Sequence, residues 1–167
     1  MEDFESYSQE ERALVESHLQ EEPSFLMKII RAHFLFEQKL NEMLRLLVRN
    51  PSVLESSKAP RVDFHTKLFF VRAIAPSPPN DWFWPALLKV NRIRNKAAHG
   101  LESEKLNTAI QDFVDHMKNN CEIHKKNMAA MGRVDLEDEC VYAMTSAFAF
   151  HTVYLRKLQQ HLEANNQ

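Results

Sequence analysis

The stretch from Ser24 to Val48, SFLMKIIRAHFLFEQKLNEMLRLLV, decides the fold that we expect for this chain. Its apolar residues recur at spacings of three and four, which is typical of one face of an α-helix. Pro23 precedes the segment and Asn50-Pro51 follows it, so both ends carry the signals of a helix boundary. The predicted inward stripe comprises Leu26, Ile30, Phe34, Leu40, Leu44 and Leu47.

The same periodicity continues outward in both directions from this segment. Only two of the 167 residues are glycine, which disfavours tight β-hairpins and glycine-rich phosphate loops. The sequence therefore predicts a single all-α domain over residues 1–167, an up-and-down bundle of about five or six helices. A short N-terminal helix is expected within 1–22, a loop at 51–61 and a frayed tail at 163–167. The other helices are predicted over 62–74, 82–98, 102–128 and 135–162.

The composition excludes several classes of protein. A net charge of −2 gives no overall positive field for non-specific binding to duplex DNA. Cys121 and Cys140 form no CxxC pair, so the sequence indicates neither a zinc site nor a redox centre, and we expect no cofactor. We find no apolar segment long enough to span a membrane and no signal peptide, so the expected location is cytoplasmic.

The segment Arg94-Asn95-Lys96-Ala97-Ala98-His99-Gly100 ends the helix predicted over 82–98. It resembles the HEPN superfamily, whose mark is Arg, four to six residues, then His, often with Asn directly after the Arg. Three other Arg-His pairs in the chain have the same bare spacing. The pair Arg94–His99 is distinguished by its neighbours, which are Asn after the Arg, Ala before the His and Gly after it.

The resemblance implies a HEPN-like, metal-independent endoribonuclease that acts on RNA in a homodimer cleft. Such a protein would be a toxin or phage-defence effector with an antitoxin or another regulatory protein as partner. The side chains suit this chemistry. His99 can transfer protons, Arg94 can hold the scissile phosphate and Asn95 can orient either of them. On an ideal helix Arg94 and His99 lie about 140° apart, which favours a site completed by a second subunit.

Two other interpretations stay open. One is a non-catalytic HEPN-like binding or regulatory protein, similar to the mannitol-operon repressor family. The other is a generic helical interaction protein, since basic residues also stabilise a helix C-terminus through its dipole. One HEPN toxin branch carries a tyrosine two residues after the motif His, where a partner nucleotidyltransferase adds AMP. Leu101 occupies that position here, so we expect no such control.

Four further residues are candidates for supporting the motif or binding RNA: Glu37, Lys67, Arg92 and Lys96. A carboxylate on an apolar helix face needs a partner, so Glu37 is expected to pair with Lys67 or with a motif-helix arginine. A structural ion pair is the favoured interpretation, and Lys67 can alternatively contact phosphate. Histidines 33 and 151 are expected to be hydrogen-bonded core residues. Two aromatic clusters, Trp82-Phe83-Trp84 and Phe69-Phe70, are expected in the core or on a dimer surface.

Overall fold

The computed structural model describes residues 13–56, 60–76, 78, 81–98 and 103–165. This part of the chain is helical and contains no strand, so the predicted all-α bundle is confirmed. The elements are a π-helical turn, η1 (Glu16–Gln20), and seven α-helices: α2 (Phe25–Leu47), α3 (Ser52–Glu55), α4 (Phe64–Ile74), α5 (Phe83–Ala98), α6 (Ser103–Asn120), α7 (Glu122–Met131) and α8 (Leu136–Asn165).

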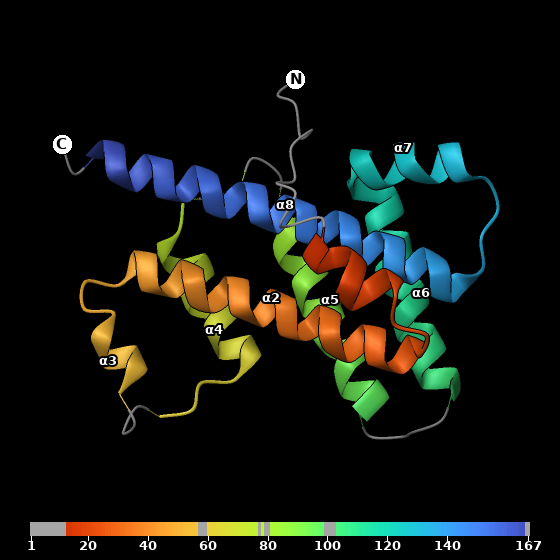
Figure 1. The fold of residues 1–167 in the computed structure, drawn as a ribbon, viewed down its shortest axis with the longest axis horizontal. Helices are drawn as coiled ribbons and strands as arrows, with labels where there is room; N and C mark the ends of the chain where they lie inside the picture. The colour runs from red at the N-terminus through yellow and green to blue at the C-terminus, as the bar shows by residue number, and fades with distance from the viewer. Residues whose placement is uncertain (1–12, 57–59, 77, 79–80, 99–102, 166–167) are drawn as a thin grey trace.

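The two longest helices form one layer of the molecule. Helices α2 and α8 pack side by side and run in the same direction, while α5 and α6 cross behind them (Figure 1). Helix α4 packs against α2 and α5 at one end of this layer, and α7 packs against α6 and α8 at the other. The motif helix α5 therefore contacts α2, α4, α6 and α8, which fixes its position in the bundle.

Local side-chain contacts define several helix ends. Ser24 begins α2, and its hydroxyl accepts a hydrogen bond from the Met27 backbone N–H. Asp63 begins α4 by accepting hydrogen bonds from both the backbone N–H and the hydroxyl of Thr66, at 3.0 and 2.9 Å. These hydrogen bonds also lower the pKa of the Asp63 carboxyl. Gly132 ends α7 with φ +79°, a conformation that favours glycine.

The structure corrects three predicted boundaries. The segment predicted as one helix over 102–128 is two helices that meet at Cys121, whose backbone is extended. Next to this break, the Asn120 side chain donates to the His116 carbonyl at 2.8 Å, which competes with the helical backbone bonds. The expected loop at 51–61 contains the short helix α3. The expected frayed tail at 163–167 is helical as far as Asn165. The first part of the expected N-terminal helix, 8–12, lies outside the described residues.

The core confirms one half of the inward face predicted for α2 and corrects the other half. Leu40 and Leu44 of α2 are buried, but Leu26, Ile30 and Phe34 are 37–52% exposed. In the first half of α2, the buried face therefore differs from the predicted one. Residues 29, 32, 33, 35 and 36 are buried there instead. Both faces of this half of α2 are apolar, so periodicity did not distinguish them.

Aromatic side chains form the centre of the core. The ring of Phe83 lies 4.9 Å from Phe150 and 5.0 Å from Trp84 between ring centroids. Tyr154, from the same cluster, donates its hydroxyl hydrogen to the Pro76 carbonyl and so connects α8 to the segment after α4. In the described part of the chain, no helix is both long and apolar enough to cross a membrane.

Candidate functional site

Helix α5 carries the described part of the motif in its last turn. Arg94 and Asn95 are both exposed, and the Arg94 guanidinium Nη1 donates a hydrogen bond to Asn95 Oδ1 at 3.0 Å. Lys96 is half-buried and follows directly. The proposed general acid or base, His99, lies outside the described residues, as does Gly100. The structure therefore places Arg94 and Asn95 on the solvent-exposed surface of the last turn of α5.

Arg92 lies on the side of α5 that faces α6. Its guanidinium Nη1 is 3.5 Å from Asp112 Oδ2, while Lys89 Nζ is 2.6 Å from the other oxygen of the same carboxylate. Asp112 therefore binds two cations of the motif helix and anchors it to α6. Arg92 and Arg94 consequently occupy different environments, and only Arg94 lies near the α2 side.

Glu37 on α2 pairs with Lys67 on α4, with 2.7 Å between Oε1 and Nζ. The partner of this carboxylate is therefore Lys67 and not Arg92 or Arg94. This agrees with the favoured interpretation of a structural ion pair. The Lys67 side chain is 15% exposed and that of Glu37 is 31% exposed. The pair is therefore partly shielded from water and links the two helices beside the motif helix.

His33 on α2 contacts the motif helix directly. Its Nε2–H donates to Asn91 Oδ1 at 3.0 Å, and its ring packs on Phe64 with 4.4 Å between centroids. The predicted hydrogen-bonded core histidine is confirmed, since His33 is only 6% exposed. Burial lowers the pKa of His33 most strongly, so this imidazole is neutral at pH 7.

The charges around His33 show which side chains lie near one another. The positive charges of Arg94 and Lys67 lower the His33 pKa, whereas the negative charge of Glu37 raises it. We call the group His33, Glu37, Lys67, Asn91 and Arg94 the α2–α4–α5 polar cluster. In this cluster the charge of the exposed Arg94 acts on His33, whose buried hydrogen bond to Asn91 lies near the half-buried Glu37–Lys67 pair.

Sequence reasoning did not predict the role of Asn91 as partner of His33. The signal was present, because His33 and Glu37 are four residues apart on α2 and Asn91 and Arg94 are three apart on α5. Residues at these spacings share one helix face. A polar pair on one face of each helix could therefore have suggested that these two faces meet.

The aromatic clusters divide into two kinds. Trp82, Phe83 and Trp84 are buried, which confirms the expectation of a core position. Phe69 and Phe70 are 64% and 47% exposed and pack on each other, so they lie on the surface of this chain. His151 is fully buried, and its Nε2–H donates to the Met43 sulfur at 3.3 Å.

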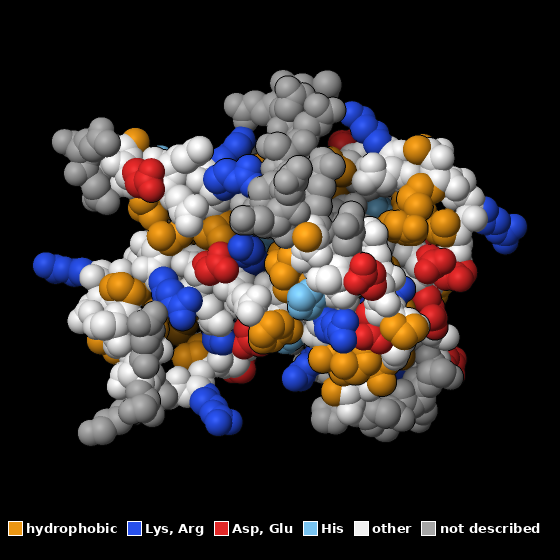
Figure 2. All heavy atoms as spheres, viewed as in Figure 1, with side chains coloured by type: hydrophobic (Ala, Val, Ile, Leu, Met, Phe, Trp, Pro, Cys, Tyr) orange, Lys and Arg blue, Asp and Glu red, His pale blue; other side chains and the backbone are white. Residues whose placement is uncertain are grey.

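Charges on the molecular surface are mixed. Figure 2 shows Lys and Arg side chains interspersed with Asp and Glu on the face that carries α2 and α8. Within the described ranges, no three His, Cys, Asp or Glu residues are grouped closely enough to hold a metal ion.

Comparisons with models of protein families, with curated proteins and with solved structures find no match to this chain.

Proposed function

We propose that this chain is a HEPN-like, metal-independent endoribonuclease in which Arg94 and His99 cleave RNA at a cleft between two copies. The observation that carries the proposal is the state of Arg94. Its neighbours Lys67, Lys89 and Arg92 each pair with a carboxylate. Arg94 is exposed, and among the described residues it has no carboxylate partner. A guanidinium in this state is available for a phosphate.

The proposed reaction follows from the side chains. The His99 imidazole removes the proton of the ribose 2′-hydroxyl, and the 2′-oxygen attacks the adjacent phosphorus. The bond to the 5′-oxygen breaks, and this oxygen receives a proton from the second histidine of the dimer. The products are a 2′,3′-cyclic phosphate and a 5′-hydroxyl. Arg94 stabilises the additional negative charge of the transition state, and its bond to Asn95 restricts the guanidinium.

In this proposal the protein is a cytoplasmic toxin or defence effector, and an antitoxin or another regulatory protein inhibits it. Induced expression of the wild-type chain is then expected to arrest growth. Arg94→Ala and His99→Ala should both abolish the arrest, whereas Arg133→Ala should not, because Arg133 is exposed and far along the chain from the motif.

Cleavage of RNA by the purified proteins tests the chemistry directly. We expect the wild-type protein to cleave RNA in the presence of EDTA. The cleavage rate of each motif variant should be lower than that of the wild type by about 10²-fold or more. Polynucleotide kinase should label the new 5′-hydroxyl ends without prior phosphatase treatment. Sedimentation should give twice the chain mass for all four proteins. A folded wild type that neither arrests growth nor cleaves RNA would contradict the proposal and favour the non-catalytic binding protein.

A further inference from the structure

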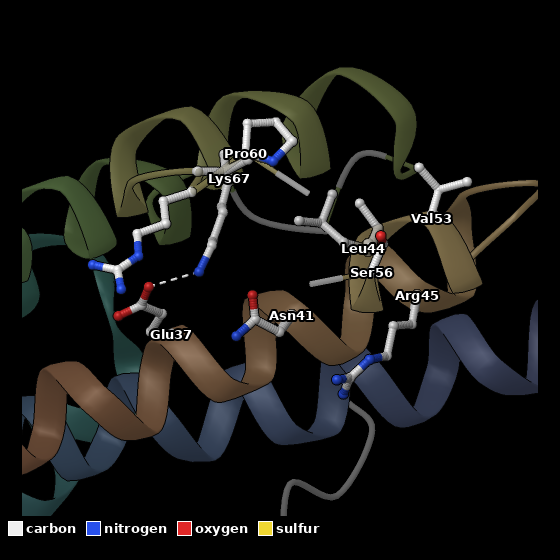
Figure 3. A pocket seen from close by; sticks show the side chains of 11 residues that line it. Glu37, Asn41, Leu44, Arg45, Val53, Ser56, Pro60 and Lys67 are labelled. Atoms are coloured by element: carbon white, nitrogen blue, oxygen red, sulfur yellow. Dashed lines mark hydrogen bonds and ion pairs between the residues drawn. The ribbon is translucent and has the colours of Figure 1, made fainter. Parts of the chain in front are cut away.

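A pocket of about 620 Å³ lies beside the α2–α4–α5 polar cluster, between the second half of α2, α3, the segment before α4, and α4 itself (Figure 3). This volume is in the range that holds a small organic ligand. The Glu37–Lys67 ion pair forms one end of the pocket. The pocket is therefore a separate hollow that shares a wall with the candidate site.

Asn41 supplies an unused pair of hydrogen-bonding groups. Its side chain extends from α2 into the pocket, between the Glu37–Lys67 pair and Leu44 (Figure 3). Among the described residues, the Asn41 carboxamide has no hydrogen-bond partner. A carboxamide presents a donor and an acceptor side by side, which matches the edge of a nucleobase.

The wall beyond Asn41 is apolar. It includes Leu44 of α2 together with Val53 and Leu54 of α3. Val53 is 59% exposed and Leu54 is 42% exposed, although both line the hollow. A flat, largely apolar ring lying against these side chains would remove that surface from water, which is favourable.

The charged lining is mainly positive. Lys67 is paired with Glu37, and the guanidinium of Arg45 is directed toward α8 (Figure 3). Arg61 is therefore the cation of the lining that remains for an anion. Arg61 is exposed at the rim. A guanidinium binds phosphate through two parallel hydrogen bonds.

We propose that this pocket binds one phosphorylated nucleoside. The base lies on the wall of Leu44, Val53 and Leu54, with its edge on the Asn41 carboxamide, and the phosphate is bound by Arg61. The nucleotide is either free in solution or part of a single-stranded RNA. Binding of this kind requires no cleavage by Arg94 and His99, so the proposal does not rest on the ribonuclease activity.

Titration of the ¹⁵N-labelled full chain, followed by NMR, tests the pocket. The probes are the four nucleoside 5′-monophosphates, the corresponding nucleosides, inorganic phosphate and a tetranucleotide RNA that carries 2′-O-methyl groups to prevent cleavage. We expect saturable shifts of backbone amides near 41–45, 53–56 and 60–67 with at least one monophosphate or with the RNA. The nucleoside and inorganic phosphate should each bind at least tenfold more weakly.

Two variants with matched controls assign the binding to the pocket. Asn41→Leu and Arg61→Gln should each weaken binding about tenfold or more. Asn107→Leu and Arg133→Gln replace the same residue types at exposed positions elsewhere and should leave binding unchanged.

The outcomes are decisive in both directions. Saturable binding of a monophosphate identifies a site for a free nucleotide, and binding of the RNA alone identifies a subsite for a nucleotide of a strand. Shifts confined to other regions, equal affinity for nucleoside and nucleotide, or unchanged binding by the Asn41 and Arg61 variants would overturn the proposal. The proposal would also be overturned if no probe gave saturable binding at ligand concentrations up to about 10 mM, since a dissociation constant much weaker than this is difficult to measure by titration.

Discussion

Asn91 links the motif helix α5 to the buried His33 of α2. Its Oδ1 accepts the only hydrogen bond that the buried His33 Nε2–H makes among the described residues. Asn91→Leu would leave this donor unsatisfied, so we expect a loss of about 1–3 kcal/mol in the free energy of unfolding. Urea unfolding of Asn91→Leu measures this loss. The control is Asn107→Leu, which replaces an exposed asparagine on α6. Equal stability of both variants and the wild type would contradict the structural role of Asn91.

The Glu37–Lys67 pair allows a second prediction at this scale. Its atoms are 2.7 Å apart, but both side chains retain some exposure, so water screens the attraction. A double-mutant cycle with Glu37→Gln and Lys67→Met should give a coupling energy of roughly 0.5–1 kcal/mol in the direction that stabilises the fold. The coupling should decrease in 1 M NaCl. A coupling near zero at low salt would show that the ion pair does not hold α2 and α4 together.

Individual helices differ in how well the sequence predicted them. The periodicity predicted that helices α4 and α8 form, and Phe64, Leu68 and Val71 of α4 and Cys140 of α8 are buried in the structure. Helix α2 is apolar on two faces, so its contacts with α4, α5 and α8 decide which face is inside. The break at Cys121 contains neither glycine nor proline, so the usual signals of a helix end are missing there.

The candidate site was predictable only where it depends on a local sequence pattern. Arg94 and Asn95 belong to a short local pattern and were singled out directly. The pairing of Glu37 with Lys67 was one of two alternatives, because a pattern on one helix does not identify the neighbouring helix. The pocket at Asn41 was not predicted, since four separate segments form it only after folding.

The aromatic cluster of α5 and α8 gives a prediction at the scale of the elements. Phe83 is fully buried and contacts Phe150 and Trp84, so Phe83→Ala leaves a cavity between the two helices. We expect a loss of about 3–5 kcal/mol in the free energy of unfolding. Phe69→Ala removes the same group from a surface position that is 64% exposed and should cost less than about 1 kcal/mol. Thermal unfolding of both variants measures the difference.

At the scale of the whole molecule, buried histidines determine how stability depends on pH. Burial lowers the pKa of His33 and His124, and it lowers that of His151 to about 3. The folded state therefore keeps these rings neutral, whereas the unfolded chain takes up protons below about pH 6.5. This contribution to stability is complete above pH 6.5 and decreases as the pH falls toward the folded pKa values.

Each histidine that protonates only on unfolding adds about 1.4 kcal/mol per pH unit to the slope of stability against pH. Urea unfolding between pH 7 and pH 4.5 should therefore show a steep loss of stability. His151→Leu should reduce this slope by about 1.4 kcal/mol per pH unit, which corresponds to one proton. The free energy of unfolding of the variant should therefore decrease less between pH 7 and pH 4.5 than that of the wild type. A wild-type slope unaffected by this substitution would contradict a neutral, buried His151.

The two buried thiols have a practical consequence. Cys121 and Cys140 are 2% and 0% exposed, and burial raises both thiol pKa values. The reactive form of a cysteine is the thiolate, so the native chain should be nearly inert to maleimide dyes at neutral pH. A cysteine introduced at Asn95 would then take up a single fluorophore. Energy transfer between donor-labelled and acceptor-labelled copies would report directly whether two motif helices come together.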